Sequence, residues 1–288
     1  MLFMAGAMLL VPGIDALAKL LSAQLSPFQI TFIRFGLQAA FLGGLLAWSR
    51  ALAVPLKVVP RLALGGTFVA AAIGFLVWSL SILPLANAIA IFFVEPLILS
   101  LLSALFLGER VGWQRLGAVA VGLLGALVVI RPNWAQFGAA ALLPLFAAVF
   151  YAAQLTVFRS LSGDLSGPRV QAYSAVFATL VLGIALLLGG AAGVDQFAWH
   201  PPRGVAWAYL AGIGVLSTIS YLLISSALKR TEAGILAPFQ YLEIISATLL
   251  GYVVFGDFPD LLTWLGTGII LASGLYVFHR ERKVARQT

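Results

Sequence analysis

Length, composition and charge place the chain in a membrane. Of its 288 residues, 62% are hydrophobic and only 9% are charged, whereas a soluble domain carries about 25% charged residues. The absence of cysteine excludes disulfides, thiolate metal sites and cysteine nucleophiles. The net charge of +7 does not indicate a nucleic-acid partner, because the basic residues are spread over short loops and one tail.

Apolar segments long enough to cross a bilayer follow one another along the whole chain. A bilayer core needs roughly 20 apolar residues per helix, and ten segments of about this length are separated by short polar breaks. The sequence therefore predicts an all-α integral membrane protein with ten transmembrane helices. The expected spans are 2–24, 28–48, 61–82, 86–107, 113–130, 137–158, 170–190, 204–227, 233–255 and 261–278.

Lysine and arginine in the short loops predict the orientation. Thirteen basic residues fall on the side of the two termini, against Arg131 and Arg203 on the other side. Basic loop residues mark the cytoplasmic side, so both termini are expected in the cytoplasm. The first segment lacks a basic start and a cleavage site and carries Asp15 and Lys19, so we expect a retained helix rather than a signal peptide.

The second half of the chain repeats the first. Residues 78–131 align with residues 224–280, and Glu95 falls on Glu243. The period is five spans, an odd number, so the two copies run through the bilayer in opposite directions. Inverted repeats are typical of secondary transporters, whose substrate site lies near mid-membrane where the halves meet. The expected organisation is a first repeat over 1–132, an inverted second repeat over 133–280, and a basic cytoplasmic tail over 281–288.

Prolines predict where the spans are interrupted. Pro12 and Pro144 lie in the first and sixth spans, and Pro96 and Pro238 lie in the fourth and ninth. A proline removes a backbone donor, and such breaks are tolerated where the freed carbonyls face protein or a water-filled cavity. These four spans are therefore expected to line a central cavity.

Five charged residues lie well inside the expected spans and not at their ends: Asp15, Lys19, Arg34, Glu95 and Glu243. A charge at the centre of a membrane helix costs about 2.5–3.5 kcal/mol, so each one is a functional candidate that needs a partner. Asp15 and Lys19 stand four residues apart in the favourable order and are expected to neutralise each other. Lys19 and Arg34 lie in the outer third of their spans and are expected to snorkel to the interface.

The two glutamates lie too deep to snorkel. Either Lys19, Arg34 or backbone N–H groups at a helix break hold them ionised, or burial favours the protonated form. Three acids face two bases within the spans, so one carboxyl lacks a full-charge partner, and protons are a candidate coupling ion. A purely structural role in the scaffold is the alternative for both glutamates.

The sequence resembles members of the drug/metabolite transporter superfamily, specifically its ten-helix EamA-type carriers. The resemblance rests on Glu95-Pro96, Leu107-Gly108-Glu109, the fifth span from Leu116-Gly117 to Gly125, and the second copy. The second copy departs from the family pattern, with Glu243-Ile244 where Glu-Pro is common and Gly256-Asp257 where Gly-Glu is common.

The resemblance implies a multi-pass protein of the bacterial inner membrane that transports small polar or amphipathic metabolites by alternating access. Export of amino acids is frequent in the family, and the aromatic-amino-acid exporters are one similar branch. Residues 237–243 are also similar to carriers that import riboflavin or S-adenosylmethionine, which leaves import as the alternative.

A cavity with aromatic rings and a few polar groups suits an amphipathic substrate. Helical spacing places Tyr151 with Gln154, Tyr221 with Ser217 and Ser225, and Phe239 or Gln240 with Glu243. Trp78 and Asn87 flank the turn before the fourth span and are expected at an outer gate. Packing is the alternative for each aromatic ring. The candidate substrate-binding residues are Asp15, Lys19, Trp78, Glu95, Tyr151, Gln154, Tyr221, Phe239, Gln240 and Glu243.

Other classes of protein fit the sequence less well. An intramembrane enzyme needs a nucleophile or a metal cluster at depth, but His200 and His279 stand at span ends on opposite sides. A channel or a purely structural membrane protein is a more distant alternative. A channel would need rings of polar groups, usually from several subunits. The chain has no Walker motif, and we expect no cofactor and no direct use of ATP.

Small residues at four-residue spacing occur in the fifth and tenth spans. They are Ala118, Gly122 and Ala126, and Gly268 and Ala272. This spacing lets helix backbones approach closely. It predicts packing between these two spans or at a dimer surface, in a protein that is a monomer or a weak homodimer.

Overall fold

The computed structural model describes residues 1–50, 52–107, 113–161, 163–228, 230, 236 and 239–285. Within these ranges the chain is helical and contains no strand. The helices are α1 (Leu2–Leu21), α2 (Pro27–Trp48), α3 (Val59–Leu80), α4 (Leu85–Phe92), α5 (Glu95–Leu107), α6 (Trp113–Phe137), α7 (Leu143–Leu161), α8 (Gly167–Ala191), α9 (Ala206–Leu228), α11 (Leu242–Phe255) and α12 (Leu261–Ala285). Three 3-10 turns complete them: η1 (Leu56–Val58), η2 (Gly138–Leu142) and η3 (Asp195–Phe197).

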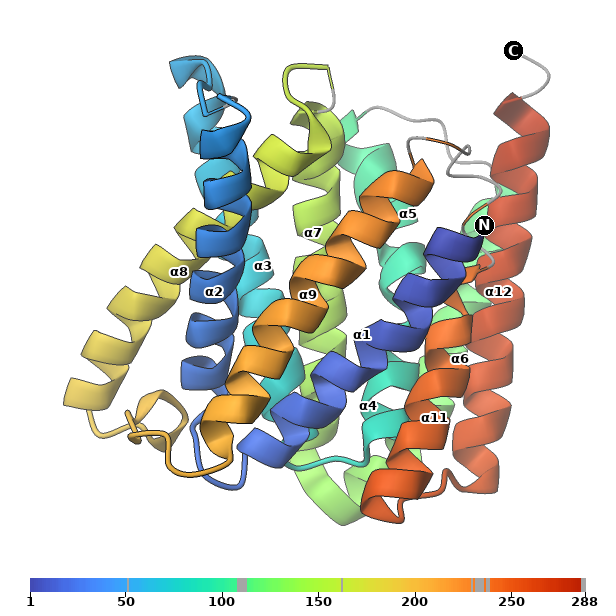
Figure 1. Ribbon diagram of the computed structural model, residues 1–288. Helices are drawn as coiled ribbons and strands as arrows, with labels where there is room; N and C mark the ends of the chain where they lie inside the picture. Colours follow the sequence, from blue (N-terminus) through green and yellow to red (C-terminus); the bar gives the residue numbers. More distant parts are fainter. Residues whose placement is uncertain are drawn as a thin grey trace.

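The helices form one bundle in which successive long helices run in opposite directions (Figure 1). We call the end where α1 begins and α12 ends the near end. The other end, where α3 connects to α4 and α11 connects to α12, is the far end. Gly108-Glu109, Pro238 and the last three residues of the expected tail lie outside the described residues. The first part of that tail continues α12 as far as Ala285.

The helices are long and apolar enough for a membrane. In the part of the chain that the structure describes, eight helical segments have the length and hydropathy of a span. One of them, Leu116–Leu161, contains most of α6 and all of α7, and another, Leu85–Phe106, contains α4 and most of α5. Helix α11 is shorter, with 14 residues. The expected all-α membrane protein is confirmed, while the number of crossings and the side of the termini stay predictions.

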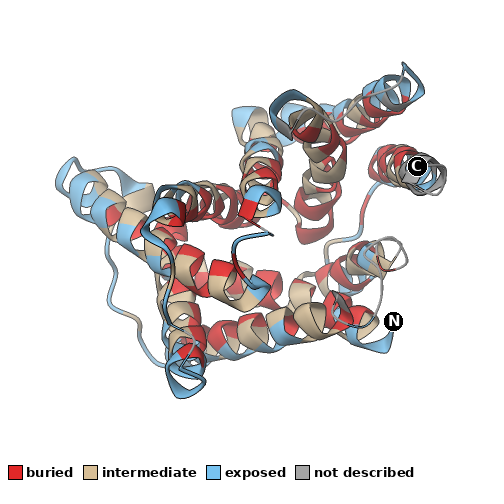
Figure 2. Ribbon diagram, turned by 90° about the horizontal axis from the view of Figure 1, so that it is seen from above, coloured by how far each residue is buried: buried red, intermediate tan, exposed pale blue. Residues whose placement is uncertain are grey.

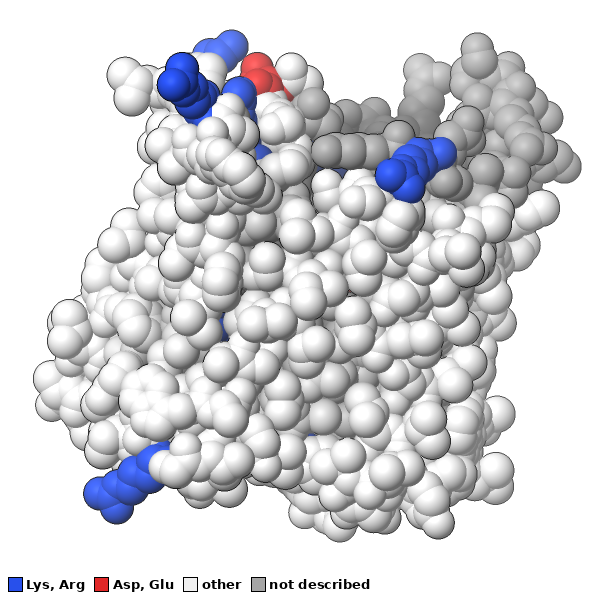
Figure 3. All heavy atoms as spheres, in the orientation of Figure 1, with Lys and Arg blue, Asp and Glu red and all other residues white. Residues whose placement is uncertain are grey.

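The outer surface of the bundle suits lipid. Basic side chains lie toward both ends of the face seen in Figure 3, and the belt between them is almost entirely uncharged. Leu180, Ile184 and Leu188 of α8 are 56%, 57% and 68% exposed. Their four-residue spacing places them on one face of the helix. Exposed leucine and isoleucine along a whole helix face are stable only against an apolar solvent. The buried residues, in contrast, face inward between the helices (Figure 2).

Helices α6 and α12 approach each other through two glycines. A Cβ atom at Gly266 would lie 2.6 Å from the backbone oxygen of Gly125 and 2.5 Å from Cγ2 of Val129. A Cβ atom at Gly125 would lie 3.0 Å from the oxygen of Gly266. The predicted packing between the fifth and tenth spans is therefore confirmed, but this close approach uses Gly125 and Gly266, which do not belong to the predicted series of small residues. Gly268 does not take part, because a Cβ atom there would meet no described atom within 4 Å.

This contact predicts a difference between two glycines on the same helix. Gly266→Ala should lower the free energy of unfolding by about 1–3 kcal/mol, the usual cost of overpacking. Gly268→Ala should be neutral or slightly stabilising, because alanine favours helix and has room there. Thermal unfolding in detergent would measure both. Equal melting temperatures for the two variants would show that α6 and α12 do not approach each other through Gly266.

Candidate substrate-binding site

The fourth expected span is broken just before Glu95. Helix α4 ends at Phe92 and α5 begins at Glu95. Between them the N–H of Val94 donates to the backbone oxygen of Ile91 at 3.2 Å. The two residues are three apart, as in a 3-10 turn, and not four apart as in an α-helix. Pro96 stands in the first turn of α5, where the missing donor costs nothing. The break places the Glu95 carboxylate at the N-terminus of a half-helix, where the helix dipole stabilises negative charge.

Glu243 occupies a matching position in the second half. Helix α11 begins at Leu242, and Glu243 lies in its first turn. The two glutamates that align in the sequence therefore each lie in the first turn of a short helix. The other two prolines differ: Pro12 lies inside α1, whereas Pro144 stands at the second position of α7, just after η2, and interrupts no helix.

A group of charged and polar side chains within the bundle is linked by electrostatic interactions, and we call it the polar cluster. Arg34 of α2 interacts electrostatically with Asp15, Tyr151 and Glu243. Glu95 interacts with Arg159, and Glu243 interacts with both Glu95 and Asp15. The cluster consists of Asp15, Arg34, Glu95, Tyr151, Arg159 and Glu243, and we include Gln154, which follows Tyr151 by one turn of α7. It draws on α1, α5, α7 and α11, the helices of the four expected lining spans, and on α2.

The polar cluster contains unsatisfied hydrogen-bonding atoms. Nε and Nη1 of Arg34, Oε1 of Glu95 and Oε1 of Gln154 are buried and have no hydrogen-bond partner within the described ranges. Gln154 is 3% exposed and follows Tyr151 by one turn of α7. Leaving such an atom unpaired costs about 1–3 kcal/mol, and buried polar atoms in proteins are normally paired. Since both donors and acceptors are unpaired, a ligand that carries both kinds of group would satisfy them.

Lys19 does not neutralise Asp15, so that expectation is wrong. Nζ of Lys19 instead lies 3.0 Å from Oδ2 of Asp257 and donates to the oxygen of Leu83 at 2.9 Å. The same Nζ lies 4.8 Å from the centre of the Phe255 ring. The long side chain reaches the far end, where a carboxylate, a carbonyl and a ring face it together. Asp15, 3% exposed, faces the polar cluster instead.

Arg34 does not snorkel, which is a second correction. Two of its nitrogens are buried, and the acids that face it are Asp15 and Glu243. Charged side chains within membrane helices usually face the interior of the bundle and pair with one another. The polar cluster therefore contains three acids and two bases, the same numbers as expected for the spans. Arg159 is the second base in place of Lys19.

Arg159 is the residue of the polar cluster that sequence reasoning missed. It was expected in a cytoplasmic loop, but α7 continues to Leu161, past the expected end at 158. Nη1 of Arg159 donates to Oγ of Ser103 on α5 at 2.9 Å, and the guanidinium faces Glu95. The available signal was its position eight residues, or about two turns, after Tyr151 on one helix.

The remaining predicted residues lie apart from the polar cluster. Trp78 packs on Phe75 and Phe28, with ring centres 6.1 and 6.3 Å away. Asn87, expected beside it at a gate, donates from Nδ2 to Oδ1 of Asn133 at 2.9 Å and so joins α4 to α6.

Three further candidates lie on or near α9 and α11. Tyr221 bonds to Ser225 and packs on the group that contains Leu42 of α2. Phe239 packs against the group that contains Met4 of α1, and Gln240 is exposed. Of the ten candidate residues, the structure therefore brings together Asp15, Glu95, Tyr151, Gln154 and Glu243.

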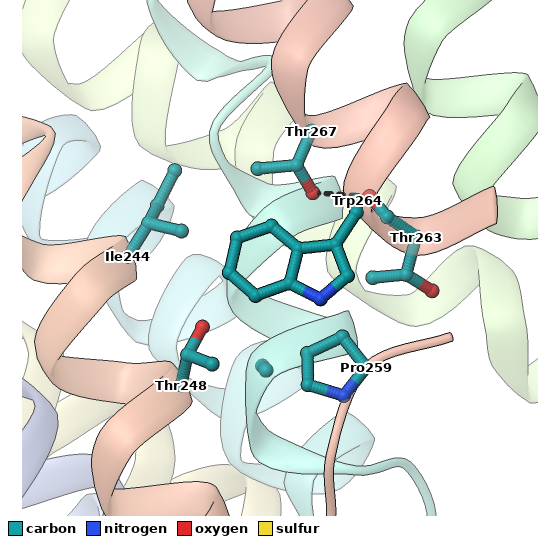
Figure 4. A pocket seen from close by; sticks show the side chains of 7 residues that line it. Ile244, Thr248, Pro259, Thr263, Trp264 and Thr267 are labelled. Atoms are coloured by element: carbon teal, nitrogen blue, oxygen red, sulfur yellow. Dashed lines mark hydrogen bonds between the residues drawn. The ribbon is translucent and has the colours of Figure 1, made fainter. Parts of the chain in front are cut away.

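A small pocket lies among α4, α11 and α12 (Figure 4). Its lining is apolar or carries hydroxyls, and the hydroxyl of Thr267 is already used, donating to the oxygen of Thr263 at 2.6 Å. The pocket therefore lacks the charges of the polar cluster. The lining residues are Ala86, Ile244, Thr248, Pro259, Thr263, Trp264 and Thr267. No group of three His, Cys, Asp or Glu residues suited to a metal ion occurs in the described chain.

Broken helices that carry charged groups into the interior of a membrane bundle are typical of secondary carriers. The chain belongs to the EamA-like transporter family. The sequence pattern of this family matches residues 1–131 and, a second time, residues 138–278. The resemblance to EamA-type carriers seen in the sequence is confirmed. The protein is a multi-pass transport protein of the bacterial inner membrane and not an enzyme.

Characterised relatives differ in what they carry. The riboflavin transporter of Rhizobium johnstonii is 30% identical over 221 residues, 76% of this chain and 70% of its own length. The S-adenosylmethionine uptake transporter of Rickettsia felis is 25% identical over 270 residues, 93% and 88% of the two chains. The pseudopaline exporter of Pseudomonas aeruginosa is 28% identical over 270 residues, 93% and 92%. A solved crystal structure matches with a TM-score of 0.64 at 20% identity, covering 98% of this chain and 97% of that one, which shows the same fold.

Proposed function

We propose that the protein is a secondary carrier that exports an amino acid, aromatic or related, across the inner membrane by alternating access. The observation that supports this proposal is the polar cluster, in which buried donors of Arg34 and buried acceptors of Glu95 and Gln154 are unpaired. An amino acid carries a carboxylate and an ammonium group. The carboxylate suits the planar fork of Arg34, and the ammonium suits Glu95 or Glu243.

The surroundings of Tyr151 favour an amphipathic or aromatic side chain on the substrate. Tyr151 belongs to the polar cluster, and its ring meets Phe92 edge-to-face, with ring centres 5.4 Å apart. Phe92 is the last residue of α4, directly before the break. Aromatic rings beside a few fixed polar groups are the usual lining of a site for a small organic molecule.

The mechanism that we propose uses two inverted five-helix repeats, 1–132 and 133–280, with both termini in the cytoplasm. The separate family matches to the two halves support this organisation. The equivalent positions of Glu95 and Glu243 at helix starts also support it, since inverted repeats place paired elements at similar depth. The two halves would rock around the polar cluster and expose it to each side in turn, as a monomer or a weak homodimer.

Import is the second candidate function, because relatives named for riboflavin transport and S-adenosylmethionine uptake are similar over most of the chain. S-adenosylmethionine carries the same carboxylate and ammonium as an amino acid and would fit the same cluster. Riboflavin has neither group and would offer no carboxylate to Arg34.

Uptake of labelled compounds into proteoliposomes tests the proposal. The panel is tryptophan, phenylalanine, threonine, riboflavin and S-adenosylmethionine, each with and without an imposed pH gradient, and protein-free liposomes give the background. Uptake of amino acids alone would support the export proposal. Uptake of riboflavin alone would contradict it and would make Arg34 a structural residue.

A further inference from the structure

Lys19 joins three separate segments at the far end of the bundle. Its Nζ meets the oxygen of Leu83, before α4, at 2.9 Å and Oδ2 of Asp257, after α11, at 3.0 Å. It also lies over the ring of Phe255. The side chains of Lys19 and Asp257 are only 17% and 33% exposed. A partly dehydrated ion pair with a further charge-assisted hydrogen bond is stronger than a pair on an open surface.

The backbone holds Asp257 in place. Gly256 ends α11 in the left-handed conformation, with a φ of 71°. The N–H of Gly256 donates to Tyr252 at 3.0 Å, and the N–H of Asp257 donates to Gly251 at 3.1 Å. These bonds satisfy the last carbonyls of the helix, and the left-handed residue is one that glycine adopts without strain. The carboxylate is therefore fixed relative to α11 and not carried by a loose loop.

Each partner of the ion pair is connected to the polar cluster by one helix. Lys19 follows Asp15 by four residues on α1, which is about 6 Å along the helix axis. Asp257 directly follows the C-cap of α11, the helix whose first turn carries Glu243. A shift of α1 relative to α11 would therefore move Asp15 against Glu243 and Lys19 against Asp257 together.

We propose that Lys19 and Asp257 form a latch that holds the far end of the bundle closed, and that α1 and α11 couple its opening to the polar cluster. In Figure 1 the end of α1 and the connection from α11 to α12 both lie at the lower edge of the bundle. The latch rests on the alternating-access carrier proposed above. It adds the contact that must break when the site opens toward the far end.

The absence of native cysteine allows a direct test with one reporter thiol. Ala88 of α4 is fully buried between the Leu83 contact and the helix break. In proteoliposomes, Ala88→Cys would be labelled from each side with a membrane-impermeant maleimide. Lys19→Ala or Asp257→Asn should raise the rate of labelling from the far end about tenfold, because a hydrogen-bonded charge pair is lost. The double variant should label no faster than either single one, since both remove the same interaction.

Lys57→Ala is the matched control, because it removes an ion pair at the near end. Nζ of Lys57 lies 3.5 Å from Oδ1 of Asp164, and its loss should leave far-end labelling unchanged. Hydrogen–deuterium exchange of residues 81–86 and 256–260 gives a second readout that needs no reporter cysteine. Both segments should exchange faster in Lys19→Ala.

The outcomes separate the latch from the carrier function. Unchanged labelling and unchanged exchange in Lys19→Ala and Asp257→Asn, with transport retained, would overturn the latch and leave the carrier in place. Faster labelling in both variants, with no uptake of any panel compound by the unmodified protein, would support the latch and refute the proposed transport of those compounds.

Discussion

Replacing Arg34 by alanine is expected to reduce uptake of an amino-acid substrate at low concentration by about a hundredfold or more. Truncating one partner of a buried, hydrogen-bonded charge pair between a protein and its ligand costs about 2–5 kcal/mol of binding free energy, and each 1.4 kcal/mol is a factor of ten in affinity. In the unmodified protein, Arg34 faces Asp15 and Glu243 and keeps two nitrogens for a ligand. Initial rates of uptake into proteoliposomes measure the effect.

Arg34→Lys separates substrate recognition from folding. Lysine keeps the positive charge toward the acids but loses the planar fork that binds a carboxylate. We therefore expect a normal melting temperature with a KM raised at least about tenfold. Arg61→Ala is a control of the same type outside the polar cluster, because Arg61 bonds to the oxygen of Ser160 at 3.0 Å and to Asp164 at 3.4 Å. An unchanged KM in Arg34→Lys would assign Arg34 to the scaffold.

Glu95→Gln and Glu243→Gln are expected to separate exchange from coupled transport. Glutamine has the shape of a protonated glutamate but cannot release a proton. A gradient of one pH unit supports about tenfold accumulation when one proton moves per substrate. The glutamine variant of the coupling residue should lose this accumulation while exchange of labelled for unlabelled substrate continues.

The control for this second prediction is Asp164→Asn. Asp164 pairs with Lys57 and Arg61 outside the polar cluster, so the same change of acid to amide should leave accumulation intact. Accumulation that persists in both glutamine variants would exclude proton coupling through these two residues. Loss of exchange as well as accumulation would instead make the carboxylate a substrate contact.

The sequence is a good guide to the helices and to the two glutamates. The spacing of apolar segments predicts helix within each expected range, because the bilayer fixes the length of a span. Glu95 could be assigned to a break because Pro96 follows it. Glu243 could be assigned by alignment with Glu95, although it lacks the proline.

The pairing of the charges could not be predicted, since it depends on contacts between distant residues. Asp257 is 238 residues from Lys19, and nothing in the spacing of Asp15 and Lys19 indicates that a remote carboxylate competes with the near one. Arg159 could not be placed in the bundle because the sequence predicts that its helix ends at residue 158, whereas α7 continues to Leu161. The aromatic candidates show the same limit, since Tyr221 and Phe239 share helix faces with polar residues and yet pack on α2 and α1.

The glycine contact between α6 and α12 has a mechanical consequence for a carrier. These helices close the first and second halves of the chain, and the oxygen of Gly125 leaves no room for a side chain at Gly266. Sliding of one helix along the other would drive Val129 and Ile269 into the opposite backbone, whereas a small rotation about the contact would not. The pair therefore suits a pivot. Halves that turn about such a pivot would open one end only as they close the other, which prevents a continuous leak across the membrane.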